Sequence, residues 1–270
     1  MTRLLLLIAI LNASLCTALP KTANGNELQI GVFDDHQLYL DMSGPYRTGW
    51  AILNMAAERA NIRIVPKPDA WARGLYELKS GHLDGVYGAI PNEERLVWAK
   101  FLLPLSYEQI YVYAPMASPL NKLDEIDMST ASVGVSKDSI QHNLANSLGF
   151  SEVYAILDRN VQFKLLQANR VDYLIYSSTF VNIYCAKFDS ELRERCLKPL
   201  RPALSSRQFS VMYNKSSKTH NKLYQALDAA LVDLYEQGAI QTLYRQHFAQ
   251  ESKAYEQWKT FWKQALDENN

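Results

Sequence analysis

The chain has no excess of charge of either sign, because 28 Lys and Arg residues balance 28 Asp and Glu residues. Without net charge there is no long-range attraction to nucleic acid or to an anionic membrane, and we expect neither as a partner. After the first residues, no apolar run approaches the ~20 residues of a membrane-spanning helix. Apolar residues make up 48% and charged residues 21% of the chain, which excludes a disordered protein and predicts a folded globular one.

Sequence motifs of common enzymes and metal sites are absent as well. The chain contains no G-x-S-x-G, no H-E-x-x-H and no G-x-x-x-x-G-K-[ST]. It has no Cys-x-x-Cys, and its histidines lack the spacing of metal ligands, since they stand at His36, His82, His142, His220 and His247. We therefore expect no catalytic residue, no metal and no cofactor.

The N-terminus has the parts of a secretory signal peptide. Arg3 gives a basic start, residues 4–11 form a short apolar run, and small residues precede Ala18. A lipoprotein anchored through Cys16 is disfavoured, because Leu15 stands where a small residue is expected. We predict a signal peptide over residues 1–18, cleavage after Ala18 and export to the periplasm.

Cys185 and Cys196 are the two cysteines left after this cleavage. In an oxidising compartment, such a pair favours a structural disulfide over two free thiols. The residues between them include no His, which argues against zinc. A bridge across this short loop would contribute roughly 3 kcal/mol to stability.

Strand and helix patterns alternate along the chain. Residues 28–33 read as a buried strand, residues 50–60 as a helix that follows a Gly44-Pro45 turn, and residues 62–65 as the next strand. A further helix begins near Trp71 and ends at Gly81. For 270 residues at ~150 per domain, this alternation predicts an α/β protein of about two lobes with mostly parallel sheets.

One helix-to-strand unit occurs twice, at residues 78–86 and 166–174. Each copy has Gly or Asn at a left-handed cap position, Gly81 or Asn169, followed three residues later by an Asp that enters a strand. The repeat predicts two similar lobes. Tyr- and Val-rich strands at 109–114 and 209–213 bracket the second copy, and we predict that they cross between the lobes.

The C-terminal part is predicted to be helical. Apolar residues at helical spacing run from Leu223 to Leu234, Gly238 ends this stripe, and residues 240–247 continue as a second helix. Trp258 and Trp262 in the tail lie near helical spacing, which favours a docking face over a ligand site.

Motifs between residues 28 and 248 resemble the family 3 periplasmic solute-binding proteins, the polar amino-acid type of extracytoplasmic receptor. The densest stretch begins at Trp71 and continues through Leu78-x-x-Gly81-x-x-Asp84, Glu94-Arg95 and Phe101-x-x-Pro104-x-x-Tyr107. Val133-Gly134-Val135 is similar to the first strand of the family's second lobe, and residues 238–248 are similar to its closing motif. The order and spacing of these motifs are more specific than any one of them.

The resemblance implies an α/β, two-lobed periplasmic binding protein-like fold of type II, in which two crossover strands join lobes that each have a mixed, mostly parallel sheet. The expected division is 26–112 for the first part of lobe 1, 113–207 for lobe 2, 208–250 for the return segment of lobe 1 and 251–270 for a helical tail. Such proteins capture a small polar solute by lobe closure and deliver it to an inner-membrane permease of an ABC transporter or to a sensor. We expect a monomer.

The resemblance also implies ligand-binding residues. Arg95 matches the family's carboxylate-binding arginine, because a guanidinium can hold a carboxylate with two hydrogen bonds. A surface arginine paired with Glu93 or Glu94 is the alternative. Asn92 stands where the family has Thr, and Ser177 replaces the acid that pairs with the α-ammonium group of amino acids. The expected ligand therefore bears a carboxylate, with a weaker preference for ordinary α-amino acids.

Other candidates are open to two interpretations each. Ser139 and Ser177 stand at predicted helix starts, where they either line the cleft or cap a helix. Trp71 and Arg73 lie two residues apart, so one of them could line the cleft while the other packs elsewhere. Tyr87 lies at a strand end, where it either lines the cleft or packs as a core tyrosine. Asp34 and its neighbour Asp35 end the first strand, where they either line the cleft or are solvated turn carboxylates.

The leading hypothesis is a non-enzymatic periplasmic solute-binding protein. An alternative is an enzyme on the same scaffold, a dehydratase or lyase that acts on a small carboxylated substrate, which would need a proton-transfer pair in the cleft. Asp34, Asp35 and His36 could supply such groups. A third hypothesis is a protein-interaction module, which would have no pocket for a small molecule.

Overall fold

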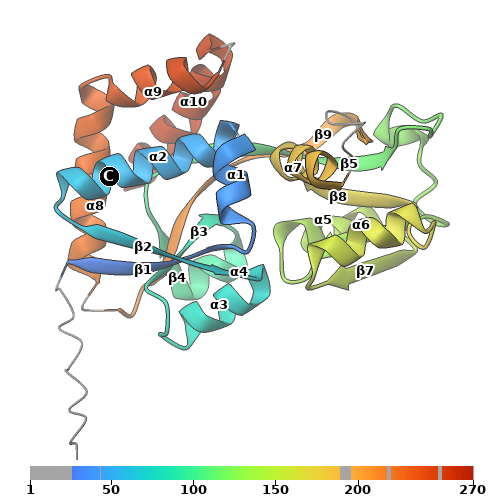
Figure 1. Ribbon diagram of the computed structural model, residues 1–270, viewed down its shortest axis with the longest axis horizontal. Helices are drawn as coiled ribbons and strands as arrows, with labels where there is room; N and C mark the ends of the chain where they lie inside the picture. The colour runs from blue at the N-terminus through green and yellow to red at the C-terminus, as the bar shows by residue number, and fades with distance from the viewer. Residues whose placement is uncertain (1–25, 43, 189–195, 218–219, 249–250, 270) are drawn as a thin grey trace, which may run out of the picture.

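The computed structural model describes residues 26–42, 44–188, 196–217, 220–248 and 251–269. Figure 1 shows two lobes that are joined by the long strands β5 and β9. The predicted signal peptide over residues 1–18 lies outside the described residues. The two-lobed α/β fold with two crossover strands is as the sequence predicts, and the residue limits of the lobes stay a prediction.

The sheet of the first lobe is built around a central strand. Strand β1 (Glu27–Phe33) lies between β2 (Arg63–Asp69) and β3 (Gly85–Ala89) and runs parallel to both. β3 then pairs antiparallel with β9 (Leu197–Asn214), which also pairs with the short β4 (Ala99–Phe101).

The second lobe repeats this order. Strand β6 (Ser132–Ser136) lies between β7 (Glu152–Ile156) and β8 (Tyr173–Ser177) and is parallel to both, and β8 pairs antiparallel with β5 (Ser106–Pro115). β5 and β9 pair antiparallel with each other. The strands predicted at 109–114 and 209–213 are therefore the crossovers, and they are longer than their apolar patterns indicated.

The repeated sequence unit occupies equivalent places in the two lobes. Gly81 and Asn169 adopt left-handed φ angles of 79° and 52°. The carboxylates of Asp84 and Asp172 accept hydrogen bonds from backbone N–H groups of the neighbouring strands, Gln29 at 2.7 Å and Ser132 at 2.9 Å. The same cap and the same aspartate thus fix where each third strand enters its sheet.

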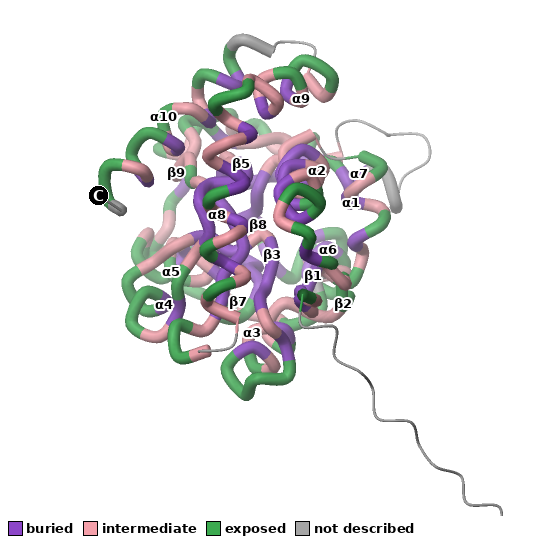
Figure 2. Tube along the Cα trace, turned by 90° about the vertical axis from the view of Figure 1, so that its left-hand side faces the viewer, coloured by how far each residue is buried: buried purple, intermediate pink, exposed green. Residues whose placement is uncertain are grey.

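Helices cover both sheets, and the buried residues follow the strands and the inner faces of these helices (Figure 2). In the first lobe they are α1 (His36–Met42), α2 (Gly44–Arg59), α3 (Trp71–Lys79) and α4 (Glu93–Trp98). In the second lobe they are α5 (Ile140–Leu148), α6 (Arg159–Gln167) and α7 (Ser178–Phe188), with a 3-10 turn at Leu123–Glu125. The chain ends with α8 (Asn221–Glu236), α9 (Ala239–His247) and α10 (Glu251–Asn269).

Two helical predictions have clear outcomes. Helix α2 begins at Gly44, six residues earlier than predicted, so Gly44-Pro45 is not a turn before the helix. Pro is compatible with the first turn of a helix, where its missing N–H has no intrahelical partner. The predicted docking face of the tail is confirmed, because Trp258 and Trp262 are fully buried.

The predicted disulfide between Cys185 and Cys196 is present, with the two Cα atoms 5.3 Å apart. It connects α7 to the start of β9 in the second lobe. Among the described residues, no helix is both long and apolar enough to span a membrane.

Candidate functional site

A cavity lies between the lobes, beside the carboxyl ends of β1, β3, β6 and β8. It encloses about 520 Å³ of empty space, part of it open to solvent. Both lobes and strand β5 line it, through Phe33, Tyr39, Trp71, Gly88, Ile90, Arg95, Glu108, Ser136, Ser139, Ile140, Gln141, Tyr176, Ser177 and Phe180. Because open α/β sheets bind ligands at the carboxyl ends of their strands, this cavity is the candidate site.

Arg95 is a buried cation in the wall of the cavity, with only 5% of its surface exposed. The short helix α4 holds it in place, since the Asn92 side chain caps this helix by accepting the Arg95 backbone N–H at 2.9 Å. Nη1 donates to the Ile90 carbonyl at 2.8 Å. Burial lowers the pKa of Arg95 to about 10, while Glu94 acts in the opposite direction, so the guanidinium stays charged at neutral pH.

A backbone carbonyl of the second lobe contacts two residues of the cavity wall in the first lobe. The Asp138 carbonyl of the second lobe accepts from Arg95 Nη2 at 3.2 Å and from Trp71 Nε1 at 3.3 Å. The Trp71 ring also lies under the guanidinium, 5.2 Å from ring centroid to Cζ. Because these contacts join one lobe to the other, the cleft is closed.

Ser139 and Ser177 line the cavity and also act as helix caps. Ser139 Oγ accepts from the His142 N–H at 3.2 Å and donates to the Ser136 carbonyl at 2.6 Å. Ser177 Oγ accepts from the Phe180 N–H at 3.4 Å. Each of these serines therefore both caps a helix and lines the cleft.

A buried polar cluster supports the cavity from the second lobe. The Tyr176 hydroxyl lies 3.0 Å from Ser136 Oγ and donates to the Gln162 carbonyl oxygen. Gln162 is fully buried and its amide donates to Ile156 O at 2.8 Å. The orientation of the Tyr176 ring in the cavity wall is thus fixed.

Five aromatic rings form a continuous wall of the cavity, which we call the aromatic wall: Trp71, Phe33, Tyr39, Phe180 and Tyr176. The successive ring centroids are 5.8 Å, 5.3 Å, 6.1 Å and 4.4 Å apart. The contact between Tyr39 and Phe180 crosses from the first lobe to the second. Such a wall offers ring faces to a ligand rather than hydrogen bonds.

Glu108 also lines the cavity, and the sequence analysis did not identify it. It lies on the crossover strand β5, two residues before Ile110, which pairs with Ser177 of β8. Side chains two apart on a strand share a face, as do directly paired residues, so Glu108 lies on the same face as Ser177. Only the register of β5 against β8, which no local pattern reveals, brings these two residues together.

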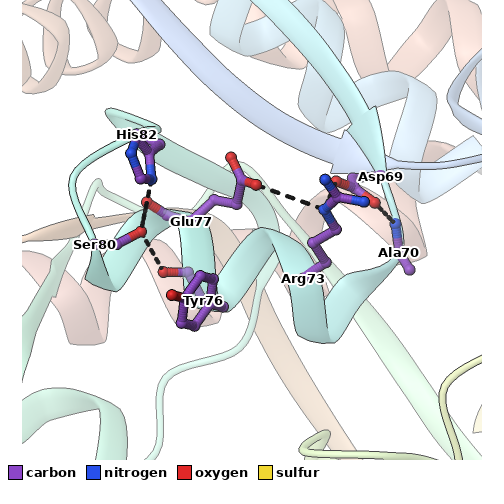
Figure 3. A network of polar contacts seen from close by, with 7 residues as sticks. All are labelled: Asp69, Ala70, Arg73, Tyr76, Glu77, Ser80 and His82. Atoms are coloured by element: carbon purple, nitrogen blue, oxygen red, sulfur yellow. Dashed lines mark hydrogen bonds and ion pairs between the residues drawn. The ribbon is translucent and has the colours of Figure 1, made fainter.

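Four predicted residues lie outside the cavity lining. Arg73 lies in an exposed network on α3 and the end of β2, where it pairs with Asp69 at 3.1 Å and Glu77 at 3.5 Å (Figure 3). Asn92 acts as the cap of α4. Tyr87 is fully buried, and its hydroxyl donates to the Tyr46 carbonyl at 2.6 Å. Asp34 accepts from the Asp35 N–H at 3.1 Å in a turn.

The neighbours of two of these residues line the cavity in their place. Phe33 precedes Asp34 at the end of β1, and Gly88 follows Tyr87 near the end of β3. Asp34 lies in the turn after β1, and Gly88 has a left-handed φ of 84° at an irregularity of β3 between Tyr87 and Ala89. The structure therefore brings together Arg95, Trp71, Ser139 and Ser177, whose roles in ligand binding stay predictions.

Residues 41–250 match the sequence profile of the bacterial extracellular solute-binding proteins, family 3. This match spans more than three quarters of the chain. No match was found among the curated proteins.

Solved structures share the fold at low sequence identity. A mutant of ArgBP from T. maritima is 17% identical, with 83% of this chain and 96% of that chain covered and a TM-score of 0.66. The arginine-, lysine-, histidine-binding protein ArtJ from Geobacillus stearothermophilus is 16% identical, with the same coverage and a TM-score of 0.66. A histidine kinase sensor domain with similarity to periplasmic binding proteins is 18% identical, again with the same coverage, and has a TM-score of 0.67.

Proposed function

We propose that this chain, which belongs to the bacterial extracellular solute-binding proteins of family 3, captures a small carboxylate-bearing solute between its lobes. Arg95 carries the proposal. It places a charged, almost fully buried guanidinium in the cavity wall, and a guanidinium is the side chain best suited to hold a carboxylate with two hydrogen bonds.

The proposed cycle uses lobe closure. An open cleft admits the solute, and closure brings Asp138 and the second lobe's share of the aromatic wall against the first lobe. Hinge motion would take place in β5 and β9, the two strands that connect the lobes. In this function Arg95 binds and orients the solute and does no chemistry on it.

The proposed place of action is the periplasm, after cleavage of the signal peptide at Ala18. The receiving partner is an inner-membrane ABC permease or a sensor. The family and the substrate-binding proteins of amino-acid ABC transporters among the similar structures support the permease. The histidine kinase sensor domain of the same fold supports the sensor.

A thermal-shift screen of amino acids, other carboxylates and peptides tests the proposal, followed by calorimetry and product analysis for each compound that binds. Arg95→Ala should weaken binding by about 2–5 kcal/mol, and Arg95→Lys should restore it only in part. Arg73→Ala, which removes an exposed arginine of the same lobe, is the matched control and should change affinity little. Tight binding that survives Arg95→Ala, or turnover of the bound compound, would contradict the proposal.

A further inference from the structure

A second cavity lies in the first lobe, outside the cleft. It encloses about 1720 Å³ of empty space, part of it open to solvent, and it shares no lining residue with the cavity between the lobes. Its walls are β4, β9, residues 102–104, α4, α8 and the end of α10. The family match ends at residue 250 and α10 begins at Glu251, so one wall of this cavity lies outside the family profile.

The wall formed by α8 is polar. Asn221, Gln225 and Asp228 of this helix line the cavity, which we call the α8 groove. The three residues are four and three positions apart, so they share one face of the helix. Apolar side chains, among them Leu96 and Phe101, line other walls, so the groove offers both hydrogen bonds and apolar contact.

The Asp228 carboxylate has a hydrogen bond but no cation. Oδ1 accepts the Leu103 N–H at 2.9 Å, and burial raises the pKa of this carboxyl to about 6, so it is ionised at neutral pH. Two lysines line the groove, Lys100 and Lys215, but both are exposed, and Lys215 Nζ donates to the Leu96 carbonyl at 3.5 Å. A cation in the groove would therefore pair with a charge that the described part of the chain leaves uncompensated.

Two buried amide oxygens in the groove also lack a donor. Gln208 Oε1 of β9 and Asn221 Oδ1 of α8 accept no hydrogen bond from any residue that the structure describes. Such acceptors cost stability, and N–H groups of a ligand would remove this cost. Within the described ranges, no group of three or more His, Cys, Asp or Glu residues could hold a metal ion, so the cation that fits is organic.

We propose that the α8 groove is a second ligand site, which binds an elongated organic cation through its N–H groups. An alkylguanidinium or alkylammonium end pairs with Asp228, and a second N–H donor reaches Asn221. The two residues are two helical turns apart, about 10 Å along α8, which sets the length of the ligand. This site does not depend on the proposed function, because the groove and the cleft share no lining residue.

Two isosteric probes test the inference. 4-Guanidinobutanamide is a cation, 4-ureidobutanamide is neutral, and neither carries a carboxylate for the cleft. Titration of the full mature chain, followed by its backbone amide NMR signals, gives their affinity ratio and the place of binding. The cationic probe should bind the wild type more tightly and should shift the Leu103 amide signal, because this N–H bonds to Asp228. Asp228→Asn keeps an oxygen for that bond but removes the charge. It should reduce the affinity ratio by about 10- to 100-fold, as expected for a hydrogen bond to a charged group.

Matched variants separate the possible outcomes. Asp267→Asn, an exposed change on α10 next to the groove, should leave the ratio unchanged. Asn221→Ala should weaken both probes by a similar factor, which tests the groove if Asp228→Asn unfolds. The inference is wrong if the cationic probe does not bind, if the ratio survives Asp228→Asn, or if the probe shifts the signals of Ser139 and Ser177 in the cleft and not that of Leu103. The proposed function, which is tested with carboxylates, would stand in each case.

Discussion

The guanidinium of Arg95 in the first lobe donates a hydrogen bond to the backbone carbonyl of Asp138 in the second, at 3.2 Å. The same carbonyl accepts from the Trp71 indole at 3.3 Å. Asp138 has a φ of 56°, in the left-handed region that Asp tolerates better than most residues. The residue proposed to hold the ligand therefore also connects the lobes, so the proposed function predicts that binding is coupled to closure.

Trp71→Phe should shift the protein without ligand toward the open form. The change keeps an aromatic ring in the wall but removes the indole N–H that bonds to Asp138. A hydrogen bond of this kind contributes about 1 kcal/mol net, so the ratio of closed to open protein should fall about five-fold. Small-angle scattering should show a larger radius of gyration.

Trp98→Phe is the control for this change. It is the same substitution in the same lobe, and the Trp98 indole N–H has no hydrogen-bond partner among the described residues. Equal radii for the wild type and both variants would show that the contact with Asp138 does not hold the lobes together.

Reduction of the disulfide should destabilise the protein. The bridge joins Cys185 and Cys196, which are 11 residues apart, and a loop of this size is worth roughly 3 kcal/mol through the lost entropy of the unfolded chain. Urea unfolding with and without a reductant measures the difference. The double variant Cys185→Ala, Cys196→Ala should be insensitive to the reductant, and two titrating thiols in the denatured, unreduced protein would contradict the prediction.

The sequence predicted those parts of the fold that depend on local rules. Gly81 and Asn169 are at left-handed caps because backbone geometry favours Gly and Asn there, and the aspartates that follow them have equivalent roles in both lobes. The resemblance to the family implied Arg95 as a ligand residue, and a helix cap three residues before it fixes its position in the cavity wall. None of these inferences requires knowledge of which strands pair.

The parts of the site that depend on strand register could not be predicted. Glu108 faces the cavity beside Ser177 only because β5 pairs with β8 in one particular register. Tyr87 lies in the core while Gly88 lines the cavity, at an irregularity in the pairing of β3 with β9. A one-residue change of register reverses every side chain of a strand, and the sequence of a single strand does not determine it.

Trp258→Ala should be among the most destabilising single substitutions. Trp258 of α10 is fully buried and packs against the rings of Tyr244, Tyr255 and Trp262. Its indole N–H donates to the Pro104 carbonyl next to β5 at 3.0 Å. Truncation of such a side chain costs about 3–5 kcal/mol. Tyr76→Ala, which removes a ring that is 69% exposed, should cost less than about 0.5 kcal/mol in the same urea titration. Similar costs for the two changes would show that α10 does not contribute to the stability of the fold.

His36 should make the protein less stable as the pH falls. Burial lowers the pKa of His36 from 6.5 to about 4 in the folded protein, so between these values the unfolded chain binds more protons. The stabilising contribution is complete above pH 6.5 and is lost as the pH falls toward 4. His36→Gln should reduce this loss of stability by about 1–2 kcal/mol. This is less than the free energy that corresponds to the full pKa shift, because the ring is not completely desolvated. The exposed variant His82→Gln should retain the wild-type profile in urea unfolding between pH 4 and 7.

Asp228 should have the opposite effect over almost the same range. Burial raises the pKa of this carboxyl from 3.8 to about 6, although the Leu103 N–H that it accepts at 2.9 Å opposes the shift. The folded protein therefore binds the proton more tightly than the unfolded chain, and its stability falls as the pH rises from about 4 to 6. Asp228→Asn removes this cost, so the variant should be more stable than the wild type at pH 7 by about 1–3 kcal/mol. It should also lose stability more steeply on acidification, because the effect of His36 is then no longer opposed.

Asp124→Asn, an exposed change, serves as the control. Parallel pH profiles of stability for Asp228→Asn and the wild type would show that Asp228 is already ionised at low pH in the folded protein.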